Sequence, residues 1–291
     1  MAETGHKAWQ GKTDGTPWMQ RSLIALFRVF PLWLLYGLMG LVIPFYMMFA
    51  PGFGASYRFF RKRIGKGPVS SFLHVYKNEF ELGMVVLDRF AAYGGKIFKV
   101  EVEGRDIFDG LCAKESGFIM LTAHVGNFEM VGYTLSSGKT VNALVFGGET
   151  DTIKSNRSKV FGRTNVKVLP ISGDMSHIFL MNDALSRGEI VSISGDRSTD
   201  SGRTISCPFM GENARFPLGP FKLAAVREIP VIAAYSLKTG ISDYKVYVEA
   251  LPEYTGKENK IQFLADSYAA SLEKIARKYP DQWYNFYDFW K

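Results

Sequence analysis

The chain of 291 residues has few cysteines and no serine nucleophile motif. Its two cysteines, Cys112 and Cys207, belong neither to a CxxC pair nor to a histidine–cysteine cluster. This pattern argues against a disulfide framework and a zinc site, and it fits a reducing cytoplasmic setting. The motif GxSxG is also absent, so a serine-based hydrolase is not evident. We expect no metal and no cofactor.

Charged side chains are absent from Val29 to Ala50, where nearly every residue is apolar. A helix of about 20 apolar residues is long enough to span a bilayer. The stretch has no signal-peptide cleavage pattern, and it is interrupted by Pro31, Gly37, Gly40 and Pro44. A kinked or interfacial helix pair is therefore an alternative to a spanning helix. A buried helix of a soluble core, followed by a solvated turn, is the third interpretation.

Five basic side chains follow this apolar stretch: Arg58, Arg61, Lys62, Arg63 and Lys66. Each such charge contributes roughly 1 kcal/mol of attraction near an anionic leaflet. The cluster also predicts that the chain downstream lies in the cytoplasm. Together with the net charge of +7, it indicates an acidic partner such as anionic lipid or a carrier protein. These features favour membrane attachment.

Helix-like and strand-like segments alternate through the rest of the chain. Strands are expected at 97–102, 118–121, 141–146, 166–169, 190–193, 231–235 and 244–248. Helices are expected at 69–93, from about 127, and at 174–187, 221–227 and 257–279. Pro170 is expected to end a strand, Asp174 to cap the next helix, and Pro220 to be the first helical residue of the one after it. This alternation predicts a single α/β domain with a largely parallel central sheet flanked by helices.

The most informative stretch is 117–130. Its apolar run 118–121 has the length and flanks of a buried strand. His124 comes next, at the corner between strand and helix, and Asn127 supplies N-cap chemistry. Glu129 then falls in the first helical turn, where the helix dipole favours a carboxylate. The arrangement is typical of an active site, and a hydrogen-bonded structural histidine is the alternative.

The spacing His-x4-Glu occurs twice in the chain, and its surroundings separate the two cases. His74 and Glu79 lie in an expected helix, where residues five apart point about 140° away from each other. We interpret His74 as an ordinary helix-surface histidine. Between His124 and Glu129 the backbone turns, so the carboxylate can reach the ring.

Such a pair suits general base catalysis. A neutral imidazole can take a proton from a hydroxyl or an amine, and a carboxylate would fix its tautomer and stabilise the imidazolium. Base assistance of this kind is worth a factor of about 10² to 10⁴. Because no serine or cysteine nucleophile is evident, we expect the acceptor itself to attack an acyl group, without a covalent enzyme intermediate.

Several ordered blocks carry a family resemblance. They are Ala-His-Val-Gly-Asn-Phe-Glu at 123–129, Gly-Asp-Arg at 195–197, Pro-Phe-Met-Gly at 208–211, Phe-Pro-Leu-Gly-Pro at 216–220 and the aromatic run at 283–290. The chain thereby resembles, over nearly its whole length, the bacterial lipid A biosynthesis acyltransferases of the lysophospholipid acyltransferase superfamily. The resemblance implies a membrane-associating segment at 1–66 and an acyltransferase catalytic domain at 67–291.

The resemblance also assigns roles. It implies that His124 is the general base and Glu129 its partner. The substrate-binding residues assigned in this way are Asn127, Arg157, Asp196 and Arg197. Asp196 with Arg197 would shape the donor or acceptor site at the end of a strand, where open α/β sheets bind ligands. Arg157 occupies, loosely, the arginine-bearing block of the family.

The implied substrates are an acyl thioester and a lipid. The donor would be an acyl carrier protein or coenzyme A thioester, and the acceptor a hydroxyl or amine of a lipid precursor, either lipid A-like or an amino-acid lipid. Arg197 stands where better-known lipid A enzymes often have Gln, which leaves the acceptor open. The implied location is the cytoplasmic face of the bacterial inner membrane.

Two other functions remain open on the sequence. A thioesterase-like hydrolase would use water in place of the acceptor, and a non-catalytic lipid-binding scaffold would not need His124. Nucleic acid is the weakest candidate partner, because the charge is modest and no basic-aromatic motif of a known module occurs.

Overall fold

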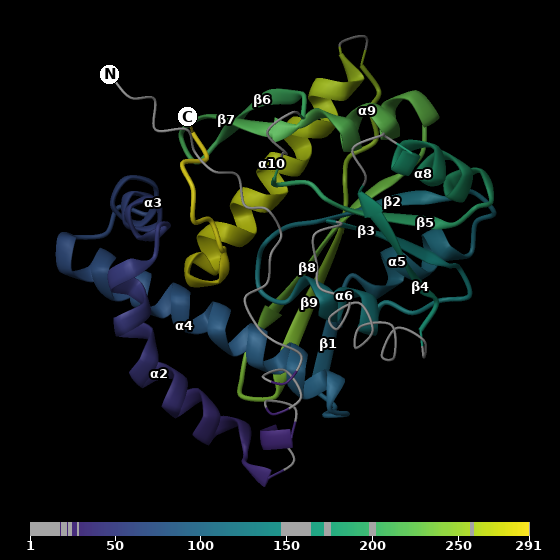
Figure 1. The fold of residues 1–291 in the computed structure, drawn as a ribbon. Helices are drawn as coiled ribbons and strands as arrows, with labels where there is room; N and C mark the ends of the chain where they lie inside the picture. Colours follow the sequence, from purple (N-terminus) through teal and green to yellow (C-terminus); the bar gives the residue numbers. More distant parts are fainter. Residues whose placement is uncertain are drawn as a thin grey trace.

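The computed structural model describes residues 29–146, 164–171, 176–197, 202–256 and 259–290, with residues 18, 22 and 25–27 before them. Within this part of the chain, seven strands form one sheet in the order β1-β9-β8-β2-β5-β3-β4 (Figure 1). Their bounds are β1 Lys99–Glu103, β2 Phe118–Thr122, β3 Val141–Phe146, β4 Val166–Ile171, β5 Ile190–Ser194, β8 Val231–Lys238 and β9 Asp243–Ala250. Neighbouring strands are parallel except at the β8–β9 pair. The predicted α/β fold with a largely parallel sheet is confirmed.

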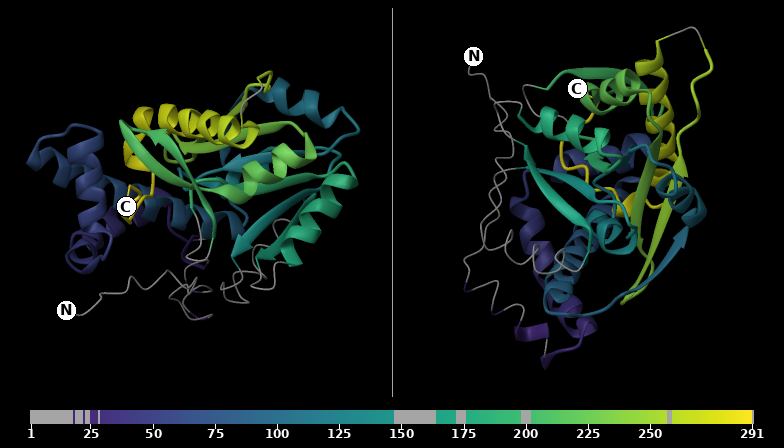
Figure 2. Two further views of the ribbon diagram at one scale, coloured as in Figure 1. Left: turned by 90° about the horizontal axis from the view of Figure 1, so that it is seen from above. Right: turned by 90° about the vertical axis from the view of Figure 1, so that its right-hand side faces the viewer.

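Helices cover both faces of this sheet (Figure 2). Their bounds are α5 Arg105–Cys112, α6 Phe128–Thr134, α8 Ser176–Ser186, α9 Leu218–Arg227 and α10 Lys260–Lys278. Side chains of α8, α9 and α10 pack on one face, and side chains of α5 and α6 pack on the other. Every residue of β2 is buried, because this strand lies inside the sheet between the two helical layers. That burial explains its uniformly apolar sequence.

Three local features differ from the predictions. The strand expected to end at Pro170 runs to Ile171, and it is an edge strand, where a missing backbone donor is tolerated. Pro220 is the third residue of α9, still within the first turn, where its missing N–H costs no helical hydrogen bond. Asp174 lies outside the described residues.

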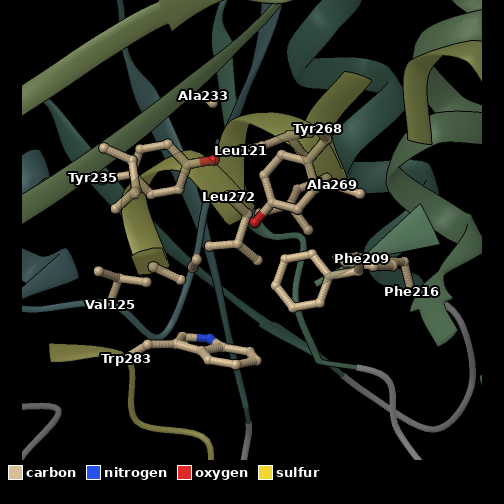
Figure 3. Close-up of a cluster of buried hydrophobic side chains, with 14 of the residues drawn as sticks. Leu121, Val125, Phe209, Phe216, Ala233, Tyr235, Tyr268, Ala269, Leu272 and Trp283 are labelled. Carbon is tan, nitrogen blue, oxygen red and sulfur yellow. The ribbon is translucent and has the colours of Figure 1, made fainter. Parts of the chain in front are cut away.

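Several elements were not predicted from the sequence. Among them are the short helix α5 and an antiparallel hairpin of β6, Thr204–Phe209, and β7, Glu212–Pro217. The hairpin buries Phe209 and Phe216 against α10 and the C-terminal segment. Figure 3 shows these two rings in one cluster with Tyr235, Tyr268 and Trp283.

The N-terminal part of the chain forms helices beside the sheet. These elements are α2 Leu32–Phe49, α3 Phe53–Arg58, the π-helical turn η1 Phe59–Arg63 and α4 Pro68–Tyr93. Helix α2 lies alongside α4, away from the sheet (Figures 1 and 2). By length and composition α2 is the one helix among the described residues that could cross a membrane.

The basic cluster is partly engaged within the protein. Arg58 pairs with Asp288, with nitrogen and oxygen 2.8 Å apart, and Arg63 pairs with Glu212 at 2.6 Å. Arg63 also lies over the ring of Trp290. These two cations join α3 to the C-terminal segment and η1 to the hairpin. Because their charges are paired within the protein, they contribute less attraction to anionic lipid than the sequence suggested.

Candidate active site

The two adjacent strands β2 and β5 bring the candidate site together. His124 follows the end of β2, and Asp196 follows the end of β5. These strands are parallel and hydrogen-bonded to each other, with Thr122 opposite Ser194. Because the carboxyl ends of parallel strands meet at the same edge of a sheet, the two side chains lie face to face.

The imidazole of His124 is held by Asp196. Nδ1 of the ring lies 2.8 Å from Oδ1 of Asp196, and the backbone N–H of His124 donates to Oδ2 at 2.9 Å. The hydroxyl of Ser194 donates to the same carboxylate at 2.8 Å, and the indole N–H of Trp283 donates to it at 3.4 Å. Four donors therefore converge on one buried carboxylate. With Nδ1 committed to Asp196, Nε2 is the nitrogen that can act as a base.

His124 and Arg197 keep Asp196 ionised. Burial by itself would raise the pKa of this carboxyl, which is only 2% exposed. The charge and hydrogen bonds of His124, together with the charge of Arg197, outweigh burial and lower the pKa of Asp196 below its ordinary value. A fixed negative charge thus stands behind the imidazole.

The turn after His124 is fixed by backbone contacts to distant segments. Gly126 has φ of +54°, and a Cβ atom there would lie 2.0 Å from the carbonyl oxygen of Ser236. Only glycine fits this approach. The N–H of Gly126 donates to Gln282, and the N–H of Tyr284 donates to the carbonyl of His124. The corner is therefore clamped between β8 and the C-terminal segment.

Glu129 is held by helix α4. Its carboxylate accepts hydrogen bonds from the guanidinium of Arg89, from the hydroxyl of Tyr93 at 3.0 Å and from that of Tyr133 at 3.3 Å. Its position in the first turn of α6 agrees with the prediction. The sequence predicted that the carboxylate of Glu129 reaches the His124 ring; in the structure, Nδ1 of this ring contacts Asp196. The catalytic role of Glu129 stays a prediction.

The other predicted site residues have different surroundings. Asn127 precedes α6, but its side chain makes no capping bond, contrary to the expectation, and it is buried beside Tyr244. The guanidinium of Arg197 donates to the carbonyl of Tyr284 at 2.6 Å and lies over the ring of Tyr287. Arg157 lies outside the described residues. The substrate-binding roles of these residues stay predictions.

His74 is more engaged than an ordinary surface histidine, which corrects our interpretation. Its ring stacks on Phe60, and Nδ1 lies 2.5 Å from Oδ1 of Asp281. This contact joins α4 to the short helix η2, Pro280–Gln282. Its role in the described structure is to pack the N-terminal helices against the C-terminal segment.

A largely apolar cavity opens beside His124. It lies between α6 and the strands β2, β3, β4 and β5. The lining residues are Met120, Thr122, His124, Phe128, Glu129, Val131, Gly132, Val141, Ala143, Leu144, Val145, Val166, Ser192 and Ser194. Polar side chains are few in this lining, and His124, Glu129 and Ser194 are among them. Among the described residues, no group of three side chains could hold a metal ion. The cavity therefore combines a base and a carboxylate with a surface suited to hydrocarbon.

Sequence reasoning missed three residues of this arrangement. Ser194 and Trp283 contact Asp196, and Arg89 contacts Glu129. The position of Ser194 directly after a predicted strand, two residues before Asp196, was a usable signal. Arg89 and Trp283 come from distant segments, and nothing local in the sequence connects them to the site.

A comparison with protein families gives a match over most of the chain. The family model described as bacterial lipid A biosynthesis acyltransferase matches residues 95–291, which are 197 of the 291 residues. A comparison with individually curated proteins gives no significant match. The matched region holds the whole sheet, the cavity, His124 and Asp196. The chain belongs to the bacterial lipid A biosynthesis acyltransferase family.

Proposed function

We propose that the protein transfers a fatty acyl chain from a thioester to a hydroxyl or amine of a lipid precursor, with His124 as general base. Family membership itself establishes an acyltransferase with an acyl donor and a lipid acceptor. The observation that carries the mechanism is the His124–Asp196 pair, which lies beside an apolar cavity.

The proposed step needs one base. Nε2 of His124 takes the proton from the acceptor hydroxyl or amine as its oxygen or nitrogen attacks the thioester carbonyl carbon. The carbon–sulfur bond then breaks, and the proton held by the imidazolium passes to the departing thiolate. Asp196 stabilises the imidazolium and keeps the base oriented, as the acid does in a hydrolase triad. The products are the acylated lipid and a free thiol.

The cavity suits the acyl chain rather than the head of the donor. Its walls are formed mainly by aliphatic side chains of β3, β4 and α6, while its polar groups gather around His124. A chain inserted between these walls would bring its carbonyl to the ring. Glu129, which lines the same cavity and is fixed by Arg89, is our second catalytic candidate, because a carboxylate near the ring favours the imidazolium form.

The donor and the location follow from chemistry and charge. The net charge of +7 suits an acidic acyl carrier protein, and a coenzyme A thioester offers the same reactive group. Both donors are cytoplasmic thioesters, so we place the enzyme at the cytoplasmic face of the inner membrane. The acceptor is either a lipid A-like or an amino-acid lipid.

A comparative lipid profile tests this function. A bacterial host lacking the gene would express the native protein, His124→Ala or the control His177→Ala at matched levels, and its lipids would be compared by mass spectrometry. His177 lies on α8 and outside the cavity lining. We expect one lipid to gain the mass of an acyl chain with the native protein and the control, and not with His124→Ala.

Other results would favour the alternative functions. Release of free fatty acid from acyl thioesters, at the same rate with and without added lipid, would indicate a thioesterase-like hydrolase. A His124→Ala protein that fully replaces the native one in cells would indicate a lipid-binding scaffold and would refute the assignment of His124.

A further inference from the structure

Helix α2 is held along one side by the folded domain. Its inner side chains recur at helical spacing and are buried: Leu32, Leu35, Tyr36, Ile43 and Met47. Two close approaches fix its position on α4. The hydroxyl of Tyr76 donates to the carbonyl of Gly40 at 3.1 Å, and Met39 packs directly over Gly83, where a Cβ atom would lie 2.3 Å from its sulfur.

Polar contacts join the same helix pair to the sheet. The hydroxyl of Tyr36 on α2 donates to Asp88 on α4, and Nζ of Lys238, at the end of β8, lies 2.6 Å from the same carboxylate. Asp88 and Lys238 are both buried. Further along α4, Arg89 binds Glu129 and Asn78 donates to the carbonyl of Asp281 at 2.8 Å. Helix α2 is therefore part of the α/β domain's structure.

The outer side of α2 is apolar and exposed. It presents Trp33, Leu41, Phe45, Tyr46, Met48 and Phe49, each more than half exposed. Val69 and Phe72, in the first turns of α4, are apolar and more than half exposed as well. A surface helix of a soluble protein carries polar residues on its outer side, and an apolar outer side needs an apolar partner.

The charges near this apolar surface indicate what kind of partner it binds. No Asp or Glu occurs between Val29 and Asn78, a span that contains six Lys or Arg residues. Arg61 and Lys62, in the turn η1 that follows α2 and α3 in the chain, are exposed. Among the six cations, Arg58 and Arg63 are paired with Asp288 and Glu212. An apolar surface with exposed cations such as Arg61 and Lys62 nearby in the chain matches an anionic lipid bilayer.

We propose that α2 lies in the plane of the membrane surface, sunk into one leaflet by its outer side, and does not cross the bilayer. A helix that crosses the bilayer takes the helix packed along it into the hydrocarbon region as well. Here one side contacts α4, which carries Lys77, Glu81 and the buried Asp88 at the same level. Crossing would pull these charges into lipid or break the contact of Tyr36 with Asp88, and both are costly.

The topology of the chain tests this proposal, whatever lipid is the acceptor. The full chain would carry an epitope tag and a specific protease site before residue 1, with an antibody against the catalytic domain as the second probe. An in-plane helix leaves both ends of α2 on one side, so the tag should be retained on intact spheroplasts and lost from inverted membrane vesicles. Loss of the tag from spheroplasts, with the catalytic domain protected, would refute the proposal. Detergent-opened membranes show that the protease site is accessible.

The surface itself is tested with vesicles of phosphatidylethanolamine and phosphatidylglycerol at three to one. Phe45→Ser removes an aromatic ring from the outer side of α2, and Phe179→Ser removes one of similar exposure, 77% against 69%, from α8. We expect the vesicle partition coefficient to fall about tenfold or more for Phe45→Ser and to stay within twofold for Phe179→Ser. Equal values for the two variants would contradict the proposal. So would a lipid-free dimer that Phe45→Ser converts to a monomer, because the surface would then join two copies of this chain.

Discussion

At the scale of single residues, the proposed mechanism depends on the charge of Asp196 behind the imidazole of His124. Asp196 is buried and accepts hydrogen bonds from both the ring and the backbone N–H of His124. A neutral amide at this position would keep the size of the side chain, but it would remove the charge that stabilises the imidazolium and would allow the wrong ring tautomer.

We expect Asp196→Asn to lower kcat by about 10² to 10⁴ with little change in KM. The measurement is the initial rate of thiol release from the acyl thioester that serves as donor, with the acceptor lipid present. Asp183→Asn, which removes a carboxylate from an exposed ion pair on α8, is the control and should keep kcat within twofold. If the Asp196→Asn variant has the same melting temperature as the native protein and retains full activity, then Asp196 does not assist His124.

At the scale of elements, α4 carries an unusual buried acid. Glu79 is 5% exposed, and burial raises its pKa to about 7. The folded protein therefore holds this proton more tightly than the unfolded chain. The stability associated with the neutral side chain is fully present below about pH 4.5, and it is lost as the pH rises towards 7.

We expect Glu79→Gln to remove this loss, because the amide does not titrate. The gain in free energy of unfolding over the native protein should increase between pH 5 and 8 and reach up to about 3 kcal/mol. Urea denaturation followed by tryptophan fluorescence at several pH values measures it. Glu253→Gln, at an exposed position, is the control. A difference between Glu79→Gln and the native protein that does not change with pH would show that Glu79 is ionised in the folded state.

At the scale of the whole molecule, one buried ion pair joins the N-terminal helices to the sheet. Asp88 and Lys238 are 150 residues apart, and the hydroxyls of Tyr36 and Tyr244 also donate to Asp88. Burial lowers the pKa of Lys238, although the charge and hydrogen bond of Asp88 act in the opposite direction. Removing the ammonium group from water therefore costs free energy that its contact with Asp88 only partly offsets. Removing one partner leaves the other charge buried and uncompensated.

We expect Lys238→Met to lower the free energy of unfolding by about 3 to 5 kcal/mol, and the double variant with Asp88→Leu to recover part of this loss. Hydrogen exchange should rise first in α2 and α4 and last in β2. Denaturation of the four proteins in a double-mutant cycle measures the coupling. Independent, additive losses would show that the pair does not hold the helices to the sheet.

The sequence by itself determined the features that depend on local periodicity. The buried strand β2 was evident from its apolar run, α4 and α10 from their helical spacing, and the corner at His124 from the change between the two patterns. Each helix or strand must bury one side or both, and the spacing of its apolar residues reflects this within a single segment. Hydrophobic periodicity can therefore be read locally. The family blocks around His124 and Asp196 also lie within short segments.

Only the tertiary structure decided which of these segments meet. The partner of the His124 ring is Asp196, 72 residues along the chain, because β5 lies next to β2 in the sheet. Strand order leaves no local pattern in a sequence. Glu129 is only five residues from His124 in the chain, so the sequence predicted it as the partner of the ring. In the same way α2 is apolar on all sides, so periodicity could not reveal which side packs on α4. Gly83 and Gly40 have no side chains, so Met39 and Tyr76 pack closely against them, and Tyr36 on the same side of α2 binds the buried Asp88. These contacts between α2 and α4 exist only in the folded chain.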